Sequence, residues 1–74
     1  MLQKRQIKEL EELINKFSYS AEKGKRMDDY LEYHFNIRKV CALQDAFNIL
    51  GYGVKCESRI KDGIKYYYFE LVKK

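Results

Sequence analysis

Apolar residues recur at helical spacing near the start of the chain. Ile7, Leu10, Leu13 or Ile14, and Phe17 follow one another at separations of three or four residues, while the residues between them are charged or polar. This spacing places them along one side of a helix, and the sequence therefore predicts an amphipathic surface helix over about residues 3–17.

The next segment, Ser18–Arg26, predicts a loop. Its apolar period is broken and it contains Gly24, which commonly interrupts helices. Lys23, Lys25 and Arg26 form a small basic cluster within it. Such clusters are common on solvated surfaces, so we favour a plain surface loop over a phosphate-binding one.

A short second helix is predicted over residues 27–35. Asp28 and Asp29 would lie in its first turn, where the helix dipole favours acidic side chains. Asn36 would end it, because asparagine tolerates the left-handed backbone conformation better than most residues. Its apolar side would consist of Met27, Tyr30, Leu31, His34 and Phe35.

A third helix is predicted from Ile37 or Arg38 to Leu50, with Gly51 ending it. Its apolar side faces the core and its other side faces outward. The inward residues are Val40, Leu43, Phe47 and Leu50. The outward residues are Arg38, Cys41, Ala42, Asp45, Asn48 and Ile49.

The C-terminal third predicts a two-stranded antiparallel β-hairpin. The sequence Lys61-Asp62-Gly63-Ile64 places Asp-Gly between two strand-like runs, as a two-residue type I′ turn requires. Counting outward from Lys61 opposite Ile64 fixes the register. The core face then carries Ser58 opposite Tyr67, Cys56 opposite Phe69 and Val54 opposite Leu71. The other face pairs Lys55 with Glu70, Glu57 with Tyr68 and Arg59 with Tyr66.

Together these elements predict an α+β fold of three helices followed by a C-terminal two-stranded hairpin. The chain has 74 residues, which we expect to form a single domain, 1–74. With 46% hydrophobic and 35% charged residues and no proline, its composition is globular. A chain this short buries a modest fraction of its surface, so we expect it to gain stability from a partner or by dimerising.

The formal net charge of +4 is concentrated near the C-terminus. Residues 51–74 hold six basic and three acidic groups, which account for three of the four excess charges. A basic surface attracts polyanions, so nucleic acid or an acidic protein surface becomes the favoured partner.

The residues offer no catalytic or metal-binding pattern. Cys41 and Cys56 are fifteen residues apart with no CxxC motif, and we interpret them as reduced, buried thiols. His34, the single histidine, has no Asp, Cys or Ser at a useful spacing, so a structural role is favoured. We therefore expect no enzyme activity, no metal and no cofactor.

The sequence also predicts a cytoplasmic protein that does not enter membranes. No run of residues reaches the apolar length of a membrane span. The first ten residues, MLQKRQIKEL, lack the apolar centre of a secretory signal.

The order of elements resembles the winged helix-turn-helix family. The segments LEYHFNI (31–37), VCALQDAFNILGYGV (40–54) and RIKDGIKYYYFEL (59–71) stand where that family has a first helix, a recognition helix and a hairpin wing. The resemblance implies a DNA-binding regulator whose recognition helix contacts bases and whose wing contacts phosphates. The implied base contacts are Arg38, Lys39, Gln44 and Asn48, and the implied phosphate contacts are Arg59, Lys61 and Lys65.

A second hypothesis stays open beside the first. The outward side of the third helix is nearly apolar, and Tyr66 and Tyr68 stand on the outer face of the hairpin with nothing obvious to cover them. For these two tyrosines we favour structural packing first, a protein interface second and nucleic-acid contact close behind. These features favour a small protein-binding adaptor or inhibitor, or a homodimer, that uses Asp45, Ile49, Tyr66 and Tyr68. Compact chains of this kind are common among phage and mobile-element regulators.

Overall fold

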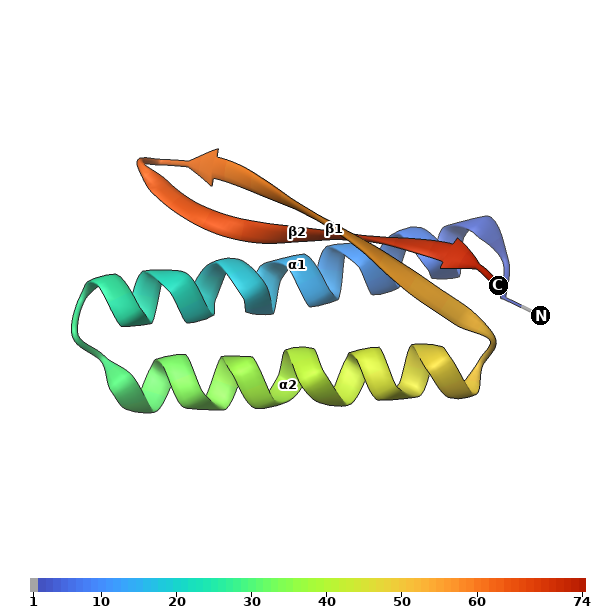
Figure 1. Cartoon of the computed structure of the whole chain (residues 1–74), viewed down its shortest axis with the longest axis horizontal. Helices are drawn as coiled ribbons and strands as arrows, with labels where there is room; N and C mark the ends of the chain where they lie inside the picture. The colour runs from blue at the N-terminus through green and yellow to red at the C-terminus, as the bar shows by residue number, and fades with distance from the viewer. Residues whose placement is uncertain (1) are drawn as a thin grey trace.

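The computed structural model describes residues 2–74 and contains two long helices followed by a β-hairpin (Figure 1). The elements are α1 (Lys4–Arg26), α2 (Tyr30–Ile49), β1 (Tyr52–Lys61) and β2 (Ile64–Lys73). The two helices run antiparallel, and the hairpin packs along α1, with β1 crossing over to reach the end of α2 (Figure 1). The α+β class is confirmed, but the fold has two helices where three were predicted.

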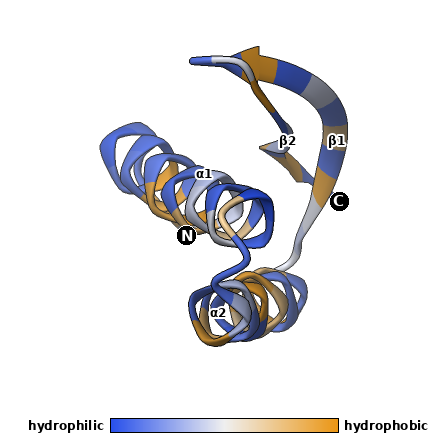
Figure 2. Ribbon diagram, turned by 90° about the vertical axis from the view of Figure 1, so that its left-hand side faces the viewer, coloured by the Kyte–Doolittle hydropathy of each residue, from blue (hydrophilic) through white to orange (hydrophobic). Residues whose placement is uncertain are grey.

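The core lies where α1, α2 and the hairpin meet. Viewed from one end, the three units surround a shared interior (Figure 2). Ile14 and Phe47 are fully buried, so both helices contribute a central side chain. The other buried members of this cluster are Val40, Tyr52, Phe69 and Leu71.

The first helix continues nine residues beyond its predicted end, so the loop predicted for Ser18–Arg26 is wrong. Ser18, Ala21 and Gly24 are buried in α1 and extend its inward side at spacings of four, three and three residues from Ile14. The helical period is carried by small residues, which a search for large apolar side chains does not detect. A Cβ at Gly24 would lie 3.1 Å from the Asp29 carbonyl oxygen, so the small residue permits close contact with the start of α2.

The turn between the helices begins at Asp28, which adopts the left-handed conformation with φ of 58°. The Asp28 N–H donates to Lys25 O and the Asp29 N–H donates to Gly24 O, which together form a Schellman motif. The Asp29 carboxylate then accepts from the Glu32 N–H and caps α2. Both aspartates therefore precede the helix, whereas the sequence predicted them in its first turn.

The second helix runs without interruption through Asn36, which corrects the predicted helix end at that residue. Asn36 is buried, and its side-chain amide donates to the carbonyl oxygen of Glu32 and to the Glu32 carboxylate. The side chain thus bonds back to the preceding turn of the same helix. Because no turn divides α2, the helix pair expected from the winged-helix resemblance is absent from residues 30–49.

The glycine that ends α2 and the turn and register of the hairpin agree with their predictions. Leu50, Ser58 and Tyr67, which were predicted to face the core, are exposed. Gly51 follows the helix with φ of 89°, and Asp62 and Gly63 both have positive φ, as a type I′ turn requires. The predicted register is confirmed at every pair, from Lys61 opposite Ile64 to Val54 opposite Leu71. Local turn chemistry was therefore sufficient to place the two strands against each other.

The hairpin meets α1 through the edge of β2. Asn15 Nδ2 donates to Phe69 O (3.0 Å), and Phe69 N donates to Asn15 Oδ1 (2.7 Å). The side-chain amide of Asn15 thus makes the pair of hydrogen bonds that the backbone of a neighbouring strand would make. Ser18 Oγ donates to Tyr67 O, and Leu71 N donates to a Glu11 carboxylate oxygen. Polar side chains of α1 therefore satisfy an edge that would otherwise be open.

The outer edge of β1 has no such cover. Pairing alternates along an antiparallel ladder, so the backbone groups of Val54, Cys56, Ser58 and Ile60 point away from β2. No backbone partner for these groups is found among residues 2–74. Cys56, predicted to be buried, is exposed, as is every residue of β1 from Lys55 to Lys61.

Candidate functional site

The four side chains predicted to contact bases do not share one surface. Arg38 is exposed on the side of α2 opposite Val40, whereas the Lys39 ammonium lies 4.9 Å from the ring centre of Phe17 on the α1 side. Gln44 is half-buried, and Asn48 accepts a hydrogen bond from the Lys74 ammonium. Residues at these positions point to at least three sides of a helix, so α2 does not bring the four side chains together.

The basic residues of the hairpin surround its turn and lie against aromatic rings. The Arg59 guanidinium stacks 3.5 Å from the ring centre of Tyr68 and makes a 2.6 Å ion pair with Glu57. The hydrogen bond to Glu57 raises the pKa of Arg59 above its ordinary value, so this side chain stays charged. The Lys61 ammonium lies 5.0 Å from the ring centre of Tyr19.

Basic residues at the C-terminal end of α1 lie beside the hairpin turn. Arg26 Nη1 donates to the carbonyl oxygen of Gly63 at 3.0 Å, which ties the C-terminal end of the helix to the tip of the hairpin. Lys25 and Lys65 line a shallow hollow beside it. Lys25 and Arg26, two members of the basic cluster that was predicted to lie in a loop, therefore lie next to Lys65, one of the predicted phosphate contacts.

Tyr66 and Tyr68 are half-buried against α1, in agreement with the structural packing that was favoured first for them. Tyr66 meets Tyr19 edge to face, with ring centres 5.4 Å apart. These two rings, together with Lys16 and Lys61, line a groove of about 310 Å³ between α1 and the hairpin. The edge-on contact of β2 explains the cover, because the side chains of both hairpin faces pass along α1.

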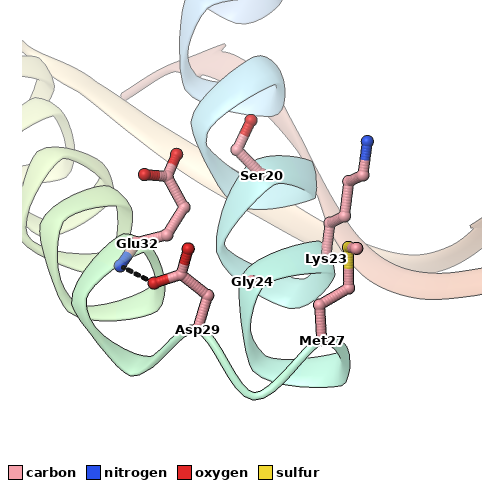
Figure 3. A pocket seen from close by; sticks show the side chains of 6 residues that line it. All are labelled: Ser20, Lys23, Gly24, Met27, Asp29 and Glu32. Carbon is pink, nitrogen blue, oxygen red and sulfur yellow. Dashed lines mark hydrogen bonds between the residues drawn. The ribbon is translucent and has the colours of Figure 1, made fainter.

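A second hollow lies beside the turn that joins the helices (Figure 3). It has a volume of about 400 Å³ and contains the carboxylates of Asp29 and Glu32. Asp29 is engaged in capping α2, and Glu32 accepts a hydrogen bond from Asn36. Both acidic groups therefore have structural partners, and the hollow offers no pair of free carboxylates for acid–base chemistry.

The side of α2 that faces away from the core is an exposed surface with large apolar residues, and we call it the outer face of α2. We define it as Leu31, Phe35, Arg38, Ala42, Asp45 and Ile49, which are all exposed and follow one another at spacings of four, three, four, three and four residues. Ile49 is 86% exposed, Leu31 73% and Phe35 57%. The predicted outward positions from Arg38 to Ile49 are confirmed as exposed.

In the N-terminal half of α2, the side predicted to face the core faces outward. Leu31, His34 and Phe35 were expected to face the core, and they are exposed. The interior position is held by Asn36, which is 5% exposed. The phase of an uninterrupted helix is common to its whole length, so Val40 and Phe47 decide which residues near the start face inward.

Neither cysteine is buried, and both are free thiols. Cys41 is adjacent to the outer face of α2, and Cys56 lies on the open edge of β1. Within residues 2–74, no group of three or more His, Cys, Asp and Glu side chains is arranged to hold a metal ion. Neither helix in this described part of the chain is long and apolar enough to cross a membrane.

Comparison with known proteins gave no match to a family model, to a curated protein or to a solved structure.

Proposed function

We propose that this chain is a non-enzymatic protein-interaction module that binds its partner through the outer face of α2. The observation that supports this most directly is the distribution of side chains in the N-terminal half of α2. There the polar Asn36 is buried, whereas the apolar Leu31 and Phe35 are exposed. A helix with apolar residues on both sides is characteristic of an element that is covered on both sides. The core covers one side of α2, so a partner would cover the other.

The energetics favour this reading. Burying a large apolar side chain contributes about 1.5–3 kcal/mol, so Leu31, Phe35 and Ile49 together would add several kcal/mol to an interface. Arg38 and Asp45 interrupt the apolar residues and would give the surface a preferred orientation. Exposed apolar residues with polar neighbours of this kind mark protein interaction sites.

The test is a photo-crosslinking residue placed at Phe35 in the expressed chain, with a matched one at Glu9 on the solvent side of α1. We expect covalent adducts from position 35 that disappear when Leu31→Glu and Ile49→Glu are added, and none from position 9. Circular dichroism would establish that the variants remain folded. Equal labelling from both positions, or none from position 35, would contradict the proposal.

Nucleic-acid binding is a second candidate, supported by the basic and aromatic group at the hairpin turn. Arg59 and Lys61 each lie over a tyrosine ring, an arrangement that suits contact with phosphates and bases together. It ranks second because Glu57 and Asp62 lie among these residues and reduce the local positive charge.

This candidate predicts affinity for a mixed-sequence duplex that falls as salt rises. Three phosphate contacts from Arg59, Lys61 and Lys65 would give a slope of log affinity against log salt of about −3. Replacing all three by Glu should abolish binding, whereas Lys8→Glu on α1 should change it little. An absence of binding at low salt would exclude this function.

A further inference from the structure

We propose that the partner of the outer face of α2 is a second copy of this chain, with the two α2 helices packed antiparallel about a two-fold axis. This inference rests on the proposed function and identifies its partner. It is drawn from three properties of the helix, which are its symmetric spacing, its two charges and the small residues between them.

The spacing of the outer face reads the same from either end. Leu31, Phe35 and Arg38 are separated by four and three residues, and the distances from Ile49 back to Asp45 and Ala42 are also four and three. Two antiparallel copies therefore place Leu31 level with Ile49 of the second copy at both ends of the contact. An alternation of three and four residues is also the spacing by which paired helices pack side chains into each other.

The two charges select the antiparallel arrangement. Arg38 and Asp45 are seven residues apart, and neither makes an ion pair within residues 2–74. Parallel copies in register would place Arg38 beside Arg38 and Asp45 beside Asp45, which is repulsive. In the antiparallel arrangement Arg38 is level with Ala42 of the second copy, and Asp45 lies about 4.5 Å further along the axis. Each dimer would then contain two Arg38–Asp45 ion pairs.

Near the middle of the contact, the small residue Ala42 lies level with the large Arg38 of the second copy. Cys41 and Ala42 lie between Arg38 and Asp45, and both are exposed. The small Ala42 leaves room for the Arg38 side chain of the second copy, while Leu31 and Ile49 fill the ends. In this arrangement the two Cys41 residues lie on the same side of the contact, offset by about 3 Å along the helix axis.

The open edge of β1 is the competing site for a second copy. Antiparallel pairing of two β1 strands about Cys56 would place Lys55 opposite Glu57 of the other copy. The α2 contact is favoured because it covers Leu31, Phe35 and Ile49, whereas the strand edge would cover the single large apolar residue Ile60. The two arrangements bring different cysteines together, which separates them experimentally.

The first test is a charge exchange measured by light scattering and sedimentation over a range of protein concentrations. We expect a concentration-dependent dimer, and we expect Arg38→Asp or Asp45→Arg alone to raise its dissociation constant at least tenfold. The double exchange Arg38→Asp with Asp45→Arg keeps the net charge and should return the constant to within about threefold of the original, because it re-forms the pairs with their signs exchanged. Lys8→Asp on α1 is the matched control and should change little.

The second test is covalent capture of single-cysteine variants by mild oxidation or a short bis-maleimide. With Cys56→Ser, the remaining Cys41 should give a covalent dimer in high yield. With Cys41→Ser, the remaining Cys56 should give little. Efficient dimer formation through Cys56 alone would overturn the α2 contact in favour of the β1 edge.

The outcomes distinguish this inference from the function on which it rests. A chain that stays monomeric at all concentrations, or a double exchange that fails to restore the dimer, overturns the second-copy proposal. If a photo-crosslinker at Phe35 still labels a different protein, the interaction function stands with another partner. If position 35 labels nothing, both proposals fail together.

Discussion

The two helices pack against each other but distribute their apolar side chains differently. In α1 the large apolar residues are buried or half-buried except Leu13, which is 38% exposed. In α2 the core takes Val40 and Phe47, while Leu31, Phe35 and Ile49 remain outside. One helix therefore completes its burial within the monomer, and the other has apolar surface left over. This difference indicates where a partner would bind.

The two phenylalanines of α2 provide the largest contrast. Phe47 is 1% exposed in the core and Phe35 is 57% exposed on the outer face. Phe47→Ala should lower the free energy of unfolding by about 3–5 kcal/mol, because it removes buried area and leaves a cavity. Phe35→Ala should cost less than about 0.5 kcal/mol when urea unfolding is measured at low micromolar concentration. Equal losses at the two positions would show that Phe35 is buried within the monomer.

A smaller effect is expected where α1 satisfies the edge of β2. Asn15→Ala leaves the N–H and C=O of Phe69 without partners in a buried setting. We expect a loss of about 2–3 kcal/mol in thermal or urea unfolding. The control is Asn48→Ala, which removes a hydrogen bond to Lys74 at an exposed site and should cost less than about 0.5 kcal/mol. Retention of full stability in Asn15→Ala would contradict the edge-on docking of the hairpin.

The smallest effect is expected at the contact between the end of α1 and the start of α2. A Cβ on Gly24 would lie 3.1 Å from Asp29 O and 3.1 Å from Tyr33 N, and neither backbone atom can move freely. Gly24→Ala should therefore destabilise the fold by about 1 kcal/mol, although alanine is the better helix former. Ser20→Ala on the same helix is the control. A stabilised Gly24→Ala variant would mean that the helices can separate at no cost.

The prediction of three helices failed at residues whose role depends on distant partners. Ser18 and Gly24 are ambiguous in sequence, since both are common in loops. Their helical state follows from contacts with Tyr67 and Asp29. The outer face of α2 was predicted only in part, again because its full extent depends on the tertiary structure. Asp45 and Ile49 were assigned to the outward side from the spacing around Val40, but Leu31 and Phe35 were assigned to the core of a helix that does not exist as a separate element.

The sequence by itself determined the features that depend on local chemistry. The first turns of α1, the end of α2 at Gly51 and the entire register of the hairpin follow from helical spacing, a glycine conformation and an Asp-Gly turn. The tertiary structure decided the rest, because continuity of α2 through Asn36, cover of Tyr66 and exposure of Phe35 depend on how rigid elements share one small core. Once Val40 and Phe47 occupy that core, the phase of the helix fixes every other side chain on it, and an apolar surface remains on the outside.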